Sequence, residues 1–147
     1  MFRLYRLLSY LLWPLLQGVL AWRLKKGKEI PQRINEKRGI TSKPRPEGTL
    51  LWFHGASVGE TLALLRLIDI ILKKHKDIHI VVTSGTKSSA MLLSEKLPKR
   101  AFHQFAPLDH PIWVERFLDY WKPDLAFMTE SDFWPNLLYS TKQKGIK

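Results

Sequence analysis

The sequence contains no cysteine, and this absence excludes several classes of site. Disulfide bonds and thiolate metal ligands are impossible, and the composition fits a reducing compartment. The five histidines show no ligand spacing of the HExxH kind, so we assign no metal and no cofactor and expect loop or surface histidines. They are His54, His75, His79, His103 and His110.

Acidic side chains are scarce, because 13 Asp and Glu stand against 24 Lys and Arg, for a formal charge of +11. Such a surface attracts phosphate groups, whether on lipid headgroups, nucleic acids or sugar phosphates. The sequence has no strand motif that interleaves basic and aromatic residues and no recognition helix, so we expect no nucleic-acid partner. At 147 residues the chain is long enough for one domain with a core and too short for two ordinary ones.

Residues 7–22 carry no charged side chain, and basic residues flank them on both sides. A helix of this length reaches only about 24 Å, short of the roughly 30 Å hydrocarbon core of a bilayer, and Pro14 interrupts it. We therefore expect residues 1–28 to form a helix that lies on a membrane without crossing it, aided by attraction of its basic flanks to anionic lipid. If the segment did span, the heavier positive charge after it would keep the rest of the chain in the cytoplasm.

Apolar residues recur in this segment at steps of three and four, which gathers them on one stripe of a helix. The other side mixes polar groups with Tyr10, Trp13 and Trp22, aromatic residues typical of the membrane interface. An ordinary helix packed through its leucines on the domain core is the alternative. A cleaved signal peptide is disfavoured because no small-residue cleavage site follows. The stripe comprises Leu4, Leu7, Leu8, Leu11, Leu12, Leu15, Leu16, Val19 and Leu20.

After a polar, proline-punctuated connector at residues 29–48, apolar runs alternate with helical patterns four times. This alternation predicts an α/β fold, a Rossmann-like doubly wound parallel sheet with right-handed crossovers. The sequence stops where the next strand should begin, so we expect the lobe at 49–147 to be truncated at its C-terminal end. The predicted strands are residues 49–54, 78–83, 101–106 and 124–128, and the predicted helices are residues 62–74, 88–97, 111–121 and 135–144, with a short helix at 32–37 in the connector.

Two glutamates follow strands whose carboxyl ends should meet. In a sheet of this class the first and fourth strands are commonly neighbours, and ligands bind in the crevice outside their carboxyl ends. Glu60 follows the first predicted strand and Glu130 follows the fourth, so the pair would face one crevice. A glutamate there could serve as a general base towards a substrate hydroxyl. The alternative is structural, because Ser57 and Glu60 have the spacing of a capping box and Glu130 that of a helix N-terminal acid.

Two distinctive runs contain these glutamates: Ser57-Val58-Gly59-Glu60 and Glu130-Ser131-Asp132-Phe133-Trp134-Pro135-Asn136. Further runs are Leu51-Trp52-Phe53-His54, Val82-Thr83-Ser84-Gly85-Thr86, Pro107-Leu108-Asp109 with Pro111, and Trp121-Lys122-Pro123-Asp124-Leu125. With the basic, apolar start, these segments resemble the amino-terminal half of the 3-deoxy-D-manno-octulosonic acid (Kdo) transferases, which add Kdo to the lipid A precursor in lipopolysaccharide assembly. Mild departures are Gly55, where an alanine-like residue is usual, and Asp132-Phe133, where Glu-Leu is usual.

The resemblance implies the amino-terminal lobe of a GT-B glycosyltransferase, in which the first lobe holds the lipid acceptor and the second holds CMP-Kdo, without a metal in the mechanism. Glu60 would be the catalytic base, and Glu130 a second catalytic carboxylate with a positioning role in the same cleft. Ser57, Gly59 and Ser131 would bind or shape the acceptor site. The implied partners are the lipid A precursor, CMP-Kdo and an anionic membrane surface, on the cytoplasmic face of the inner membrane. Because these 147 residues lack the donor lobe, the resemblance implies that this chain alone is inactive, and a non-catalytic membrane-bound binding module is the alternative.

Deleting residues 1–28 should release the chain from liposomes that contain anionic lipid, because the leucine stripe and its basic flanks are lost together. High salt should weaken binding of the intact chain, since it screens the basic flanks. Sedimentation with liposomes measures both effects. Unchanged partitioning after the deletion would contradict the membrane-associating role.

Overall fold

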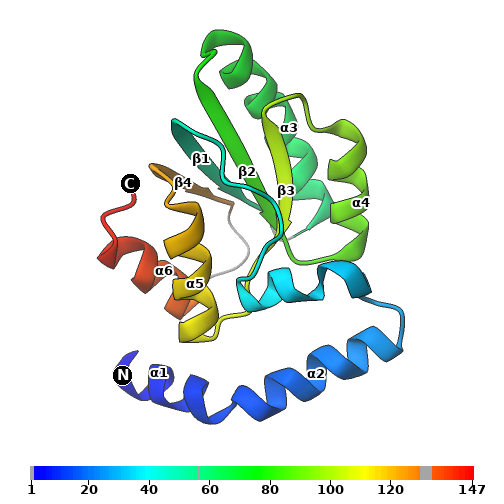
Figure 1. The fold of residues 1–147 in the computed structure, drawn as a ribbon, viewed down its shortest axis with the longest axis vertical. Helices are drawn as coiled ribbons and strands as arrows, with labels where there is room; N and C mark the ends of the chain where they lie inside the picture. The colour runs from blue at the N-terminus through cyan, green and yellow to red at the C-terminus, as the bar shows by residue number, and fades with distance from the viewer. Residues whose placement is uncertain (1, 56, 130–133) are drawn as a thin grey trace.

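The computed structural model describes residues 2–55, 57–129 and 134–147, and its centre is a four-stranded sheet in the order β3-β2-β1-β4 (Figure 1). All strand pairs are parallel, and β1 lies between β2 and β4, so the first and fourth strands are neighbours as predicted. Each predicted strand is present with its ends shifted by at most one residue. The strands are β1 (Thr49–His54), β2 (Ile78–Ser84), β3 (Ala101–Phe105) and β4 (Leu125–Met128).

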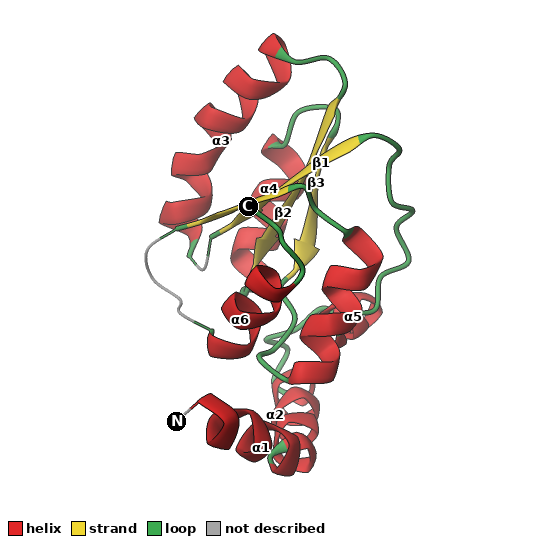
Figure 2. Cartoon of the chain, turned by 90° about the vertical axis from the view of Figure 1, so that its left-hand side faces the viewer, coloured by secondary structure: helices red, strands yellow, loops and turns green. Residues whose placement is uncertain are grey.

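Helices cover both faces of this sheet (Figure 2). On one face, Phe53 and Val82 pack against α3 (Val58–Lys74) and α4 (Lys87–Lys96). On the other, Leu50, Trp52 and Val81 pack against α5 (Pro111–Trp121) and α6 (Pro135–Gln143). The strands are apolar on both faces because both faces are buried, as is typical of parallel sheets. The predicted doubly wound α/β fold is confirmed.

The N-terminal segment is helical as predicted, and it forms two helices, α1 (Phe2–Leu11) and α2 (Trp13–Lys25), on either side of a break beside Pro14. The break has a covalent cause, because Pro14 has no N–H to donate to the preceding turn. Within the described residues, no single helix is long and apolar enough to cross a membrane. By length and composition α1 and α2 could do so only as a pair, and the pair is bent by 55°.

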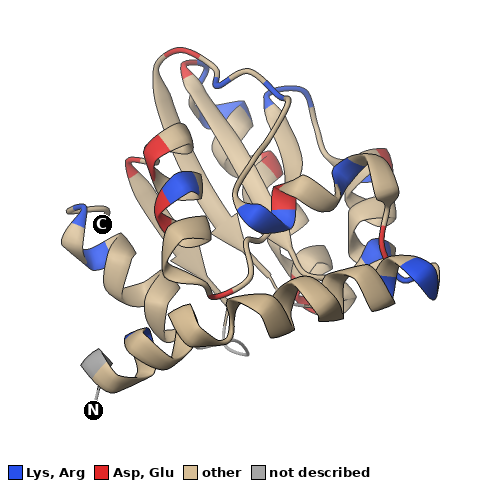
Figure 3. Ribbon diagram, turned by 60° about the horizontal axis from the view of Figure 1, so that its bottom comes forward, with Lys and Arg blue, Asp and Glu red and all other residues tan. Residues whose placement is uncertain are grey.

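The leucine stripe is largely exposed, with Leu20 buried but Leu7, Leu11 and Leu15 at 57%, 68% and 61% exposure. This exposure favours a membrane-facing role over packing on the domain core. Most of α2 carries no charge, while Lys and Arg gather at its C-terminal end (Figure 3). The two helices lie across the end of the domain towards which the strands of the sheet point (Figure 1).

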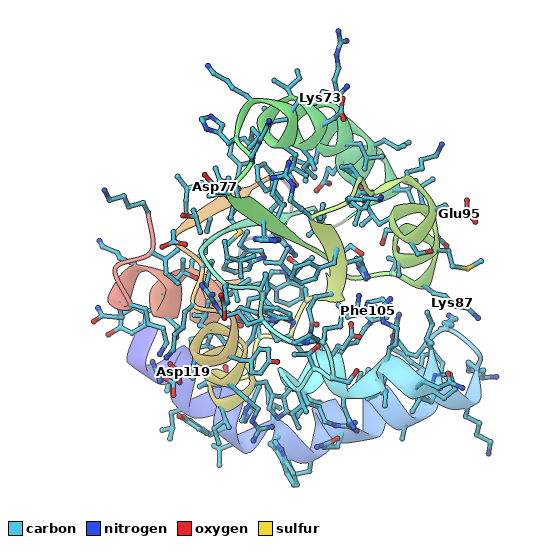
Figure 4. All side chains as sticks on the ribbon, turned by 45° about the horizontal axis from the view of Figure 1, so that its top comes forward. Lys73, Asp77, Lys87, Glu95, Phe105 and Asp119 are labelled. Carbon is cyan, nitrogen blue, oxygen red and sulfur yellow. The ribbon has the colours of Figure 1, made fainter. Side chains whose placement is uncertain are left out.

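The connector at residues 29–48 is a packed part of the fold, held by buried charges. It contains a 3-10 helix, η1 (Pro31–Arg38), where the short helix at 32–37 was predicted. The Glu36 carboxylate accepts a 2.7 Å hydrogen bond from the Phe105 amide at the end of β3. Phe105 is the last residue of β3 (Figure 4), and its ring centroid lies 4.7 Å from the guanidinium carbon of Arg33 in η1. Gly39 ends η1 with a left-handed φ of 73°, and a Cβ there would lie only 2.2 Å from the Trp113 carbonyl oxygen of α5.

His54 and His103 are buried in strands and His79 lies half-buried in β2, so the expectation of loop or surface positions is wrong for these three. His110 is buried but lies in the loop before α5. His103 lies in β3 with Arg33 Nη2 2.8 Å from its Nδ1. Arg33 can only donate, so Nδ1 is the acceptor and Nε2–H donates to Ser84 Oγ at 2.8 Å. Burial, followed by the charges of Arg33 and Lys43, lowers the pKa of His103 to about 2. The imidazole is therefore neutral in the folded protein.

Replacing His103 by Gln should flatten the acid side of the pH–stability profile. The unfolded chain takes up a proton on His103 below its ordinary pKa of 6.5, whereas the folded chain does not until about pH 2. Stability conferred by the neutral ring is therefore lost as pH falls below 6.5, by up to about 1.4 kcal/mol per pH unit. Urea unfolding between pH 7.5 and pH 4.5, of which about two pH units lie in this window, measures the slope.

The Gln variant should be less stable than the wild type at pH 7.5 and should lose less stability on acidification. The matched control is His75→Gln, because His75 is exposed at the end of α3. Burial also lowers the pKa of His110, so part of the slope should remain. Equal slopes in His103→Gln and wild type would contradict the assignment.

Candidate functional site

A cavity of about 350 Å³ lies outside the carboxyl ends of β1, β2 and β3. His54, Gly85 and Ala106 contribute the strand ends, and Val19, Leu20 and Arg23 of α2 form another part of its wall. This is the edge of the sheet where doubly wound proteins bind ligands. The sequence pattern located this edge, but it did not indicate that the N-terminal helix closes over it. The remaining lining residues are Lys37, Thr86, Pro107, Leu108 and Trp134.

His54 is the last residue of β1, and its buried ring lines the cavity. The Thr83 hydroxyl on the neighbouring strand lies 2.8 Å from His54 Nδ1 and accepts a 2.8 Å hydrogen bond from Trp52 Nε1. The ring is thus held by a residue that is itself fixed by the core. The spacing of the histidines along the chain could not predict this position, because spacing bears on metal ligands and not on a histidine at the end of a strand.

A buried cationic cluster forms one side of the cavity. Lys37 Nζ donates to Glu29 Oε1 at 2.8 Å and to the Gly85 carbonyl at 2.9 Å, and Arg23 Nε donates to the same Glu29 oxygen at 2.5 Å. Burial lowers the pKa of Lys37, and its hydrogen bond to Glu29 opposes that shift. Two cations share one carboxylate, so the cluster keeps an excess positive charge that favours anions. Sequence reasoning missed it, because all three residues lie in segments interpreted as membrane helix or connector.

Glu60 lies in the first turn of α3, beside the junction of β1 and β4. Ser57 is the N-cap residue, and its Oγ accepts a 3.3 Å hydrogen bond from the Glu60 amide. The Ser57 hydroxyl lies 3.1 Å from Glu60 Oε1, and the Thr129 hydroxyl after β4 lies 2.7 Å from Glu60 Oε2. The helix-capping role expected of Ser57 is therefore confirmed. The carboxylate is also positioned by groups from two adjacent strand ends, since Ser57 follows β1 and Thr129 follows β4.

Two of the predicted site residues, Glu130 and Ser131, lie outside the described residues. The segments on either side of them are anchored. Thr129 N–H donates to the His54 carbonyl at 3.0 Å, and Asp109 accepts hydrogen bonds from the Asn136 and Leu137 amides at 3.1 and 2.9 Å. The chain on both sides of Glu130 is thus held at the carboxyl edge of the sheet.

The predicted glycines have different surroundings. At Gly55 an added Cβ would lie 3.2 Å from Thr61 Cγ2, so the small residue lets α3 pack closely on the end of β1. At Gly59 the nearest atom would be Ser57 Oγ at 3.9 Å, which leaves the first turn of α3 open. Gly59 and Ser57 are both exposed, as a substrate-contacting loop requires.

These features define a Rossmann-like lobe with a cavity outside the carboxyl edge of its parallel sheet, which is the place where enzymes of this architecture bind ligands. The chain belongs to the Kdo transferase family of glycosyltransferases, because the family model described as "3-Deoxy-D-manno-octulosonic-acid transferase (kdotransferase)" matches residues 32–147. The matched range contains every strand of the sheet and both candidate loops. The predicted family is therefore confirmed.

Curated relatives agree with this assignment. The chain is 44% identical over 138 residues to "3-deoxy-D-manno-octulosonic acid transferase" of Rickettsia bellii, covering 94% of this chain and 33% of that protein. It is 39% identical over 137 residues to "Probable 3-deoxy-D-manno-octulosonic acid transferase, mitochondrial" of Arabidopsis thaliana, covering 93% and 31% respectively. A Rickettsia felis protein with the first of these names is 47% identical over 107 residues, covering 70% and 23%. The chain thus spans about a third, or less, of the length of these relatives.

Replacing Ser57 by Ala should lower the free energy of unfolding by about 0.5–2 kcal/mol, because an amide of the first turn of α3 loses its acceptor. Glu60→Gln should change stability little, since Gln also serves in a capping box. Urea denaturation of both variants measures the difference. Ser88→Ala on the exposed start of α4 is the matched control. A Ser57→Ala variant as stable as this control would contradict the capping role.

Proposed function

We propose that this chain is the acceptor-binding lobe of an enzyme that transfers Kdo from CMP-Kdo to the lipid A precursor. The single observation that carries the proposal is the family match across residues 32–147, which includes the strand ends and the Glu60 loop. The relatives' names state the transfer, and the acceptor and donor identities are carried to this chain as part of the proposal. The cationic cluster beside the cavity suits an acceptor or donor that carries phosphate.

In the proposed reaction Glu60 is the general base. It takes the proton of an acceptor sugar hydroxyl while the hydroxyl oxygen forms a bond to the anomeric carbon of Kdo. The bond from that carbon to the CMP phosphate breaks, and CMP leaves with its electron pair. The contacts with Ser57 and Thr129 support this role because they hold the carboxylate at the edge where the acceptor would lie. Glu130 is proposed to position substrate in the same cleft, with Ser131 beside it.

The proposed location is the cytoplasmic face of the inner membrane. The exposed leucines of α1 and α2 support it, because a continuous apolar surface on a soluble domain requires a partner. Arg23, Lys25, Lys26 and Lys28 at the end of α2 would add attraction to anionic lipid. Since α2 also lines the cavity, a lipid acceptor could reach the strand ends from the membrane surface.

The test joins residues 1–147 to the remaining part of the Rickettsia bellii relative and measures transfer from CMP-Kdo to lipid A precursor. If Glu60 is the base, Glu60→Gln should lower turnover by about 100- to 10,000-fold, the range typical of losing general base catalysis, with little change in melting temperature. Glu130→Gln should also lower turnover, with a larger share of the loss in acceptor affinity. Glu95→Gln on the exposed face of α4 is the matched control.

Full activity of the Glu60→Gln enzyme would remove the assignment of Glu60 as base. An inactive wild-type chimera that folds and binds CMP-Kdo would favour the alternative, a membrane-bound module that binds lipid without transferring sugar. Residues 1–147 without a donor lobe are the negative control, and we expect no transfer from them.

A further inference from the structure

A second, apolar cavity of about 380 Å³ lies beneath the bent pair α1–α2 and is separate from the residues that the proposed reaction uses. This volume lies within the range of about 300–1,000 Å³ that small-molecule pockets occupy. We call it the α1–α2 groove. One wall comes from the helices and the other from the β3–α5 loop and the start of α6. Its lining residues are Tyr5, Leu8, Ser9, Leu12, Leu16, Val19, Leu108, Asp109 and Trp134.

Several apolar residues of the groove remain partly exposed although the groove faces the folded domain. Leu8, Leu12 and Val19 line it and are still 47%, 48% and 40% exposed. They are distinct from the most exposed leucines of the same helices, such as Leu11 and Leu15, which do not line the groove. The bent pair therefore presents apolar side chains on two surfaces, one turned outward and one lining a groove against the domain.

The polar atoms in the groove are already used within the protein. Tyr5 Oη donates to Asp109 Oδ2 at 2.8 Å, and burial together with this hydrogen bond raises the pKa of Tyr5 to about 12. Ser9 Oγ donates to the Tyr5 carbonyl at 2.8 Å and accepts from Asn136 Nδ2 at 3.1 Å. Because these groups bond to one another, the groove offers hydrocarbon to a ligand and has little to hold ordered water.

The groove adjoins the cavity at the sheet edge, because Val19, Leu108 and Trp134 line both spaces. On the polar side of this shared boundary lie Arg23 and Lys37 with their excess positive charge, and on the other side lie the leucines of α1 and α2. A ligand that fits both spaces has an anionic or polar head and a hydrocarbon chain.

We propose that the α1–α2 groove is a binding subsite for one acyl chain of a lipid whose headgroup lies in the cavity at the sheet edge. The identity of that lipid as the sugar acceptor rests on the proposed function, whereas the acyl subsite itself rests on the groove. Hydrocarbon leaves water for the leucine-lined walls, and the cationic cluster retains the head. The subsite would hold the acceptor in one orientation, with its saccharide directed towards His54 and the Glu60 loop.

The test uses the full 147-residue chain and dodecyl phosphate below its micelle-forming concentration, with binding measured by calorimetry. Leu12→Trp places a bulky side chain in the groove and should weaken binding by about tenfold or more, because the chain can no longer bury all its methylenes. Leu11→Trp is the matched control, since the adjacent leucine is 68% exposed and does not line the groove. It should leave the affinity for dodecyl phosphate unchanged, and inorganic phosphate should bind far more weakly than dodecyl phosphate to the wild type.

A second measurement does not depend on how the variants fold. Dodecanoic acid with a photoreactive diazirine at its far end should label the wild-type chain on peptides from α1 or α2 and on the peptide containing Leu108. Equal affinity of Leu11→Trp and Leu12→Trp for dodecyl phosphate, binding that does not saturate, or labelling confined to other peptides would overturn the proposal.

The acyl subsite and the transferase function can be rejected independently of each other. Dodecyl phosphate binding needs neither a donor lobe nor Kdo transfer, so an inactive chimera would leave the groove assignment in place. Conversely, an active chimera in which Leu12→Trp leaves the KM for lipid acceptor unchanged would reject the acyl subsite and leave the transferase assignment intact.

Discussion

The arrangement of elements around the candidate site depends on the hydrogen bonds that the Asp109 carboxylate accepts. Its Oδ1 accepts from the Leu137 amide, and its Oδ2 accepts from the Asn136 amide and the Tyr5 hydroxyl. The N-cap residue of α6, Trp134, provides no side-chain cap, so the cap is supplied across space from the β3–α5 loop. One carboxylate of the β3–α5 loop thus holds both the start of α6 and the N-terminal helix α1.

His54 links the two halves of the candidate site. Its carbonyl receives the Thr129 amide and so fixes the exit of β4 beside Glu60, while its ring lines the cavity between β1 and α2. Glu60 and Ser57 do not line that cavity, so the carboxylate and the cationic cluster occupy adjoining parts of the edge. A ligand with a phosphate and a reacting hydroxyl some distance apart fits this separation better than a compact one does.

The parts that sequence could predict are those set by local patterns. Apolar runs bounded by glycine or proline identified all four strands, and the serine three residues before Glu60 identified the cap of α3. The neighbouring position of β1 and β4 followed from the rules of parallel topology. The transferase family came from the match of several short runs, which carry more information than periodicity does.

The parts that could not be predicted depend on partners far apart in the chain. Lys37 donates a hydrogen bond to the carbonyl of Gly85, 48 residues away, so a polar connector conceals a buried cation. The burial of His103 depends on Arg33, 70 residues away. The break between α1 and α2 had a local signal in Pro14, but the resulting groove required the positions of Leu108 and Asp109. The hydrophobic pattern of one segment carries no information about contacts with residues so far away in the sequence.

The contacts that hold α1 to the domain join residues more than 100 positions apart, so they form only after most of the chain has been synthesised. Tyr5 can bond to Asp109 only after Asp109 has been synthesised, and Ser9 can bond to Asn136 only after Asn136, which is 127 residues later in the chain. At translation rates of about 5–20 residues per second, roughly 6–25 s pass between synthesis of the two partners. During that interval these two contacts of α1 cannot form, whereas Gln17 of α2 meets Arg38 after only 21 residues. The contacts that hold α1 to the domain are therefore completed later in synthesis than those that hold α2.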